Sequence, residues 1–167
     1  MRNKKISTHS HDISPVAHKV LKKEMKPSHG KINSNKRILF VDDEETLATI
    51  AKQMLERLGY DVTVKTDSVE ALELFRKQPD WFDLVITDHE MPRLTGEILT
   101  KELLLIRNDI PVILSTGNSY LIPDKTTTDR GIKGVLIKPY GRLEIANVIQ
   151  EVIGSVKEND HAECFDY

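Results

Sequence analysis

Acidic, hydroxyl and basic side chains follow four short apolar segments of this 167-residue chain, each at the point where the segment ends. In chain order these side chains are Asp42 and Asp43, then Asp88, then Thr116 and finally Lys138. Short apolar segments bounded by polar and turn-forming residues predict buried strands. If the strands are parallel, their carboxyl ends meet at one edge of the sheet, where open α/β sheets bind their ligands. We therefore expect the five side chains to lie together.

The chemistry of such a cluster favours a cation and a phosphate. Three neighbouring carboxylates repel one another unless a cation lies between them. Mg²⁺ prefers oxygen ligands and is usually bound by one or two carboxylates together with a phosphate. The Lys138 ammonium and the Thr116 hydroxyl can hold phosphoryl oxygens, and Gly117 leaves room for the group to approach. The pattern predicts a Mg²⁺ site beside a phosphate-bearing anion, with one carboxylate positioned to attack.

Strand-like and helix-like segments alternate from Arg37 onward. This alternation predicts an α/β domain, with a doubly wound parallel sheet covered by helices on both faces. Gly59 is expected to close the first helix. The expected strands are 37–41, 61–65, 83–87, 111–115 and 134–137, and the expected helices are 47–58, 68–77, 96–107, 119–130 and one carrying Ile145 to Val156.

Composition divides the chain into three parts. Residues 1–36 are basic and rich in Ser, Asn and Lys, and we expect an unstructured arm. Residues 37–157 form the α/β domain, and 158–167 form a polar tail. The arm lacks interleaved aromatic residues and a recognition motif, so nucleic-acid binding is not expected. A single cysteine, the lack of an apolar run of membrane-spanning length and the lack of a signal peptide predict a cytoplasmic location without a membrane span.

Five motifs occur in a fixed order along the domain. Through them, residues 37–157 resemble the receiver domain of two-component response regulators. The resemblance implies a flavodoxin-like (βα)5 fold, with five parallel strands in the order 2-1-3-4-5. The motifs are Val41-Asp42-Asp43-Glu44, Asp83-Leu84-Val85-Ile86-Thr87-Asp88, Met91-Pro92-Arg93-Leu94-Thr95-Gly96, Pro111-Val112-Ile113-Leu114-Ser115-Thr116-Gly117 and Lys138-Pro139-Tyr140.

The resemblance implies a role for each acidic residue. Asp88 is the expected phosphoacceptor. Asp43 and Asp88 are expected to bind Mg²⁺ directly, with the backbone carbonyl of Glu90 as a third ligand. Asp42 is expected to act in the metal site largely through water.

The resemblance also assigns the residues that meet the phosphoryl group. Thr116 and Lys138 are expected to contact it, and Lys138 is expected to pair with Asp88 before phosphorylation. The family has a cis bond after this lysine, so we expect a cis Lys138–Pro139 peptide. The family usually carries an aromatic residue three positions before the lysine, where this chain has Val135, so its aromatic switch is absent or replaced by a smaller packing change.

The function implied by the resemblance is phosphoryl acceptance in a phosphorelay. The expected donor is a sensor histidine kinase or a histidine phosphotransfer protein, and the only reactions expected to be catalysed are the chain's own phosphorylation and dephosphorylation. About ten residues follow the last helix, which predicts no output or DNA-binding domain.

Two other functions stay open at this point. One is a binding module that keeps the fold but is not phosphorylated in use. The other is a Mg²⁺-dependent aspartyl phosphohydrolase of the haloacid dehalogenase type, with Asp88 as nucleophile and Glu90 as the second acid. The position of Asp88 after the third strand fits that class poorly, because its nucleophile follows the first strand. Taken singly, Asp42 or Asp43 is better explained as an acid at a helix amino terminus.

Overall fold

The computed structural model describes residues 36–117 and 131–159, with side chains as far as residue 154. Residues 1–35 of the expected arm, the fourth helix at 119–130 and most of the polar tail lie outside these ranges. Five parallel strands form one sheet in the order β2-β1-β3-β4-β5, as predicted. They are β1 (Arg37–Val41), β2 (Asp61–Lys65), β3 (Leu84–Asp88), β4 (Val112–Thr116) and β5 (Ile132–Ile137).

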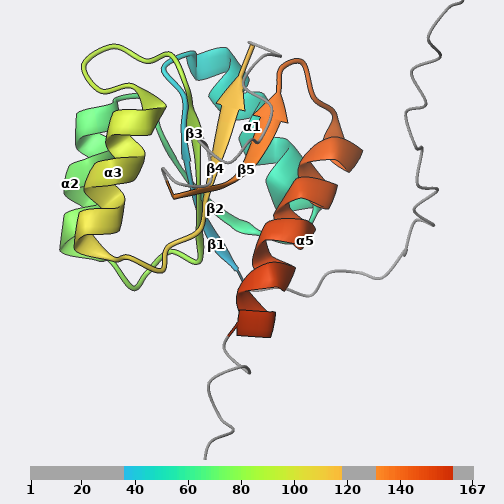
Figure 1. The fold of residues 1–167 in the computed structure, drawn as a ribbon. Helices are drawn as coiled ribbons and strands as arrows, with labels where there is room; N and C mark the ends of the chain where they lie inside the picture. The colour runs from blue at the N-terminus through green and yellow to red at the C-terminus, as the bar shows by residue number, and fades with distance from the viewer. Residues whose placement is uncertain (1–35, 118–130, 160–167) are drawn as a thin grey trace, which may run out of the picture. The chain divides into compact units, whose positions relative to one another are not determined.

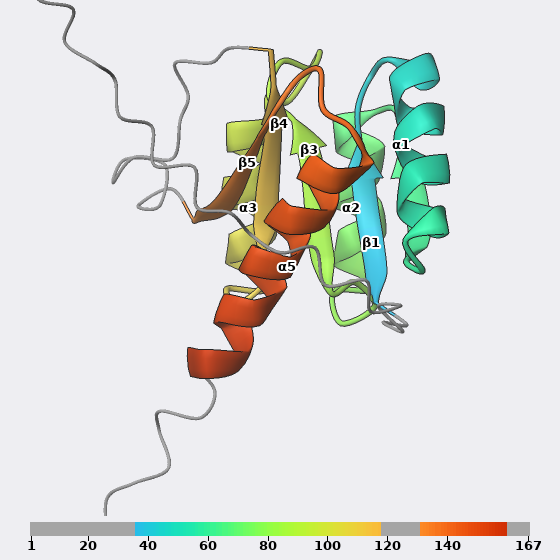
Figure 2. The ribbon, with the colours of Figure 1, turned by 90° about the vertical axis from the view of Figure 1, so that its right-hand side faces the viewer.

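Four described helices cover the two faces of this sheet. One face carries α1 (Glu45–Arg57) and α5 (Arg142–Asn159), and the other carries α2 (Ser68–Lys77) and α3 (Gly96–Ile106) (Figures 1 and 2). The predicted doubly wound α/β fold is therefore confirmed. The predicted bounds of β3 and β4 were each one residue early, and β5 begins two residues before its predicted start.

The sheet separates two hydrophobic clusters. Phe40 and Ile86 pack with α1 and α5, whereas their strand neighbours Leu39 and Val85 pack with α2 and α3. Successive side chains of a strand point to opposite faces, so β1 and β3 contribute to both clusters. Strands buried on both faces read as continuous apolar runs, which is why these two strands stand out in the sequence. The resulting rigid sheet fixes the positions of its strand ends.

Turn and cap residues set where the helices begin and end. Gly59 has a φ of +95° just after α1, a conformation that glycine adopts without steric cost and that ends the helix as predicted. Asp67 caps α2, because its Oδ1 accepts hydrogen bonds from the backbone N–H groups of Val69 and Glu70. At Gly96 a Cβ atom would overlap the Asp88 carbonyl oxygen, so only glycine lets α3 begin this close to the end of β3.

Candidate functional site

The strand ends meet at one edge of the sheet in the predicted order. Val41 pairs with Thr87, which places Asp42 beside Asp88. Asp88 in turn pairs with Ser115, so Thr116 follows on the next strand. The amide of Lys138 donates a hydrogen bond of 2.8 Å to the Thr116 carbonyl and ties the turn after β5 to β4. Backbone pairing alone therefore brings these polar residues together.

Lys138 lies between two buried carboxylates. Its Nζ is 2.5 Å from Asp88 Oδ1 and donates a hydrogen bond of 2.9 Å to Asp42 Oδ2. Asp42 is 1% exposed and Asp88 is 7% exposed. Burial alone would lower the pKa of Lys138, but the hydrogen bonds to Asp88 and Asp42 outweigh it and hold this pKa above its ordinary value. Two carboxylates share one ammonium, which leaves the cluster with an excess negative charge.

The second oxygen of each carboxylate accepts a hydrogen bond from a backbone N–H group. Asp88 Oδ2 accepts a hydrogen bond of 2.9 Å from the Glu90 amide, and Asp42 Oδ1 accepts one of 3.0 Å from the Glu44 amide. Both carboxylates are thus held from two sides. The Lys138–Pro139 peptide is cis, as predicted.

Asp43 differs from the other two acids of the expected cluster in its exposure. Its side chain is exposed, whereas those of Asp42 and Asp88 are buried against Lys138. Within the described ranges, no group of three or more acidic, histidine or cysteine side chains is arranged to hold a metal ion. The expected role of Asp43 as a direct Mg²⁺ ligand stays a prediction.

The donor set still fits Mg²⁺ chemically. Mg²⁺ retains several waters and needs only one or two protein carboxylates, so a preformed cage of three acids is not required. The oxygens of Asp42, Asp43 and Asp88 and the Glu90 carbonyl are hard ligands, and the excess negative charge of the buried pair favours a divalent cation. The Glu90 side chain is exposed, which leaves its backbone carbonyl as the relevant group.

Thr116 and its neighbours close the edge on the β4 side. Thr116 is buried at the last position of β4. Burial raises the pKa of the Tyr140 hydroxyl, and the Tyr140 side chain packs against the cluster formed with α1 and α5. Val135 is only partly buried on β5. Asn118, which follows the site in sequence, lies outside the described residues.

An apolar groove adjoins the cluster on the outside of the sheet edge. It has a volume of about 340 Å³ and runs between α1 and the turn after β5. Ile50 and Met54 line one side, and Lys138 and Pro139 line the other. Ile50 is 48% exposed, although the helical pattern of α1 groups it with the core residues. The groove therefore opens directly beside the lysine that holds Asp88.

A family profile described as "Response regulator receiver domain" matches residues 38–150 of this chain. The chain belongs to this family. Phosphorylation and Mg²⁺ binding are general features of such receiver domains, and the resemblance drawn from the five motifs is confirmed. The two-component response regulator ARR14 of Arabidopsis thaliana is 35% identical to this receiver over 127 residues.

Solved receiver structures share its fold. A response regulator receiver domain protein from Clostridium thermocellum is 31% identical to this chain, with a TM-score of 0.68. The match covers 74% of this chain and 98% of the other. The receiver domain of the sensor histidine kinase PA1611 from Pseudomonas aeruginosa, a structure with a magnesium ion in its active-site cleft, is 30% identical with a TM-score of 0.63. That match covers 72% of this chain and 99% of the other.

The curated relatives are longer than this receiver. The match to the Arabidopsis regulator covers 76% of this chain but only 33% of the relative, so the other two thirds of the relative lie outside the match. The expected lack of an output domain stays a prediction. None of the helices in the described ranges has the length and apolar character needed to cross a membrane.

Proposed function

We propose that this receiver accepts a phosphoryl group on Asp88 from a phosphohistidine of a sensor histidine kinase or a histidine phosphotransfer protein. The observation that carries the proposal is the buried Asp88 carboxylate, held at 2.5 Å by Lys138 beside a second buried carboxylate, Asp42. An acid and a lysine in this arrangement provide a nucleophile together with a cation for the incoming phosphoryl oxygens.

Asp43, Asp88 and the Glu90 carbonyl are the proposed direct ligands of Mg²⁺, with Asp42 acting through water. When bound, Mg²⁺ offsets negative charge on the transferring phosphoryl oxygens. Asp43 is exposed at the start of the turn after β1, so its side chain is free of core packing as it takes up this role.

In the proposed transfer, an Asp88 carboxylate oxygen attacks phosphorus in line with the donor nitrogen. The N–P bond of the phosphohistidine breaks as an O–P bond forms, and the imidazole leaves. Lys138 passes from Asp88 Oδ1 to a phosphoryl oxygen, which keeps its ammonium paired throughout. Thr116 contacts the phosphoryl group from β4. Later attack by water on the acyl phosphate releases inorganic phosphate and restores the carboxylate, so the signal decays.

The apolar groove beside Lys138 supports a protein donor over a free metabolite as the physiological source. Ile50 and Met54 offer an apolar edge on which a donor helix can pack, and that edge ends at the phosphoacceptor cluster. A helix seated there presents a histidine to Asp88 without any rearrangement of the sheet.

Intact mass spectrometry with a small phosphodonor and Mg²⁺ tests the proposal. Wild type is expected to gain one phosphoryl group, to lose this gain with a chelator, and to show none in Asp88→Asn. Asp83→Asn is the matched control, because Asp83 lies just before the opposite end of the same strand, paired with Lys36 at 2.8 Å. A folded, Mg²⁺-binding wild type that gains no mass would refute phosphoryl acceptance.

The second candidate is a receiver-fold binding module that is not phosphorylated in use. Val135 at the position of the usual aromatic residue is the observation in its favour. The mass experiment separates the two candidates. Steady turnover of a small phosphate ester would instead favour a phosphohydrolase, whereas we propose that only the chain's own phosphorylation and dephosphorylation are catalysed.

A further inference from the structure

The loop between β3 and α3, residues 89–95, carries the Glu90 carbonyl that we propose as a metal ligand. Both ends of this loop are tied to the sheet edge. The His89 amide donates a hydrogen bond of 2.8 Å to the Ser115 carbonyl, and the Gly96 amide donates one of 3.0 Å to the His89 carbonyl. These bonds fix the start and the end of the loop. In its outer half the Leu94 amide donates a hydrogen bond of 2.9 Å to the Pro92 carbonyl, but this bond lies within the loop and does not attach it to the rest of the domain. The outer half therefore needs a separate support.

Ser68, the first residue of α2, supplies that support. Its hydroxyl donates a hydrogen bond of 3.1 Å to the Pro92 carbonyl and accepts one of 3.2 Å from the Leu94 amide. Ser68 is 1% exposed, so water cannot readily replace the hydroxyl in these bonds. One side chain thus holds two backbone groups on opposite sides of Arg93.

Asp67 holds the same part of the loop through its side chain. Oδ1 caps α2, and Oδ2 accepts a hydrogen bond of 2.6 Å from Arg93 Nη1. Arg93 has a φ of +71°, a left-handed conformation that few residues other than glycine adopt. The bonds to Asp67 and Ser68 therefore hold a turn that the backbone alone does not favour.

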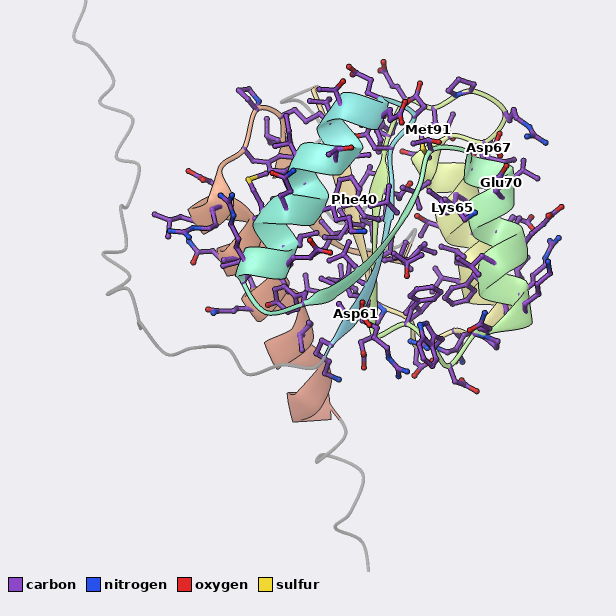
Figure 3. All side chains as sticks on the ribbon, turned by 180° about the vertical axis from the view of Figure 1, so that it is seen from behind. Phe40, Asp61, Lys65, Asp67, Glu70 and Met91 are labelled. Carbon is purple, nitrogen blue, oxygen red and sulfur yellow. The ribbon has the colours of Figure 1, made fainter. Side chains whose placement is uncertain are left out.

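Buried apolar packing completes the attachment. Met91 in this loop is buried in the hydrophobic cluster formed with α2 and α3. Figure 3 shows Asp67 and Met91 at the same end of the molecule, opposite to Asp61 at the start of β2. The loop that follows the phosphoacceptor is thus built onto the amino end of α2 as well as onto the sheet.

We propose that Ser68, assisted by Asp67, is a positioning residue for Mg²⁺, because it fixes the loop that presents the Glu90 carbonyl. This inference rests on the proposed function, and it assigns to α2 a part in the metal site that none of the five motifs contains. Loss of the Ser68 hydroxyl leaves the carboxylates and Lys138 in place but loosens the loop beside them.

The test compares Mg²⁺ affinity in wild type, Ser68→Ala and Arg93→Gln by NMR titration of backbone amides. Groups that orient metal ligands typically change metal affinity by about 10- to 100-fold, and we expect the low end, about tenfold weaker binding, for Ser68→Ala. Arg93→Gln removes an exposed ion pair and is expected to weaken binding by roughly twofold. Without metal, hydrogen exchange at the Leu94 amide should also accelerate in Ser68→Ala.

Arg107→Met is the matched control for general loosening. Arg107 also holds a loop by bonding to the backbone of that loop. Its Nη1 donates hydrogen bonds to the carbonyls of Pro79 at 2.6 Å and Phe82 at 2.8 Å. Those residues precede β3, at the opposite edge of the sheet from Asp88. This variant is expected to lose stability while keeping the wild-type Mg²⁺ affinity.

The outcomes separate this inference from the proposed function. Equal Mg²⁺ affinity in wild type and Ser68→Ala overturns the positioning role alone, as does an equal loss in Arg107→Met. A wild type that neither binds Mg²⁺ nor accepts a phosphoryl group overturns both. At saturating Mg²⁺, we expect Ser68→Ala to be phosphorylated at a rate within about twofold of wild type. This result supports a role of Ser68 in positioning the metal ligand, because the phosphoryl-transfer groups themselves are intact.

Discussion

Replacing Lys138 by methionine should leave two buried carboxylates without their cation. Lys138 lies 2.5 Å from Asp88 and 2.9 Å from Asp42, and both acids are at least nine-tenths buried. Removing one partner of a buried ion pair typically costs about 3–5 kcal/mol. Because the Lys138 side chain is 21% exposed, water screens part of the interaction, and we expect the low end, about 3 kcal/mol, at pH 7.

The loss should depend on whether another cation is present. Without Lys138, the buried carboxylates of Asp42 and Asp88 lie on neighbouring strands with no cation between them, and like charges repel. Millimolar Mg²⁺ should restore part of the lost stability at pH 7.

Urea unfolding of wild type and Lys138→Met at pH 7, with and without Mg²⁺, measures both effects. Lys52→Met is the control, because Lys52 forms an exposed pair with Glu56 at 3.8 Å and its loss should cost at most about 0.5 kcal/mol. Adding Asp42→Asn to Lys138→Met should recover stability at pH 7. A Lys138→Met protein as stable as wild type at pH 7, or one that Asp42→Asn fails to stabilise, would refute the electrostatic account of the site.

Three further predictions concern the frame of the site. Gly96→Ala should destabilise the fold by about 1–3 kcal/mol and slow phosphorylation, because the new Cβ overlaps the Asp88 carbonyl; unfolding and mass measurements check this, and an unchanged rate would contradict it. The raised pKa of Lys138 predicts that wild-type stability declines as pH rises above 10.5, and that this decline is weaker in Lys138→Met. Burial opposes ionisation of Asp83, but hydrogen bonds from the Arg37 amide and from Lys36 outweigh it and lower the pKa of the Asp83 carboxyl group. The stability of wild type should therefore fall as pH drops below 3.8, and that of Asp83→Asn should fall less.

The sequence was sufficient for the sheet and for the edge that carries the chemistry. Apolar strands ending in Asp42, Asp88, Thr116 and Lys138, separated by helical segments, permit few topologies, and parallel pairing then places those residues side by side. Register follows from strand ends and burial, both of which are local properties of the sequence.

Contacts between residues far apart in the sequence were harder to predict. Asp67 before a helical pattern predicts a cap, but nothing local indicates that its second oxygen holds Arg93, 26 positions away. Ser68 likewise looks like an ordinary first residue of a helix. The exposure of Asp43 beside the buried Asp42 was not predicted either, because residue type alone does not reveal how deeply each member of an acidic pair is buried.

The exposure of Ile50 has a consequence for how the partner of such a receiver can be changed. The reactive groups stand on the sheet, whereas Ile50 lies on a helix surface outside both hydrophobic clusters. Substitutions at exposed positions usually change stability by less than about 0.5 kcal/mol, so this position can vary while the chemistry is untouched. Under the proposed function, a donor helix packs on Ile50 and Met54, whereas Asp88 and Lys138 carry out the transfer. Changing Ile50 and Met54 is then expected to alter donor choice without altering the phosphoryl chemistry.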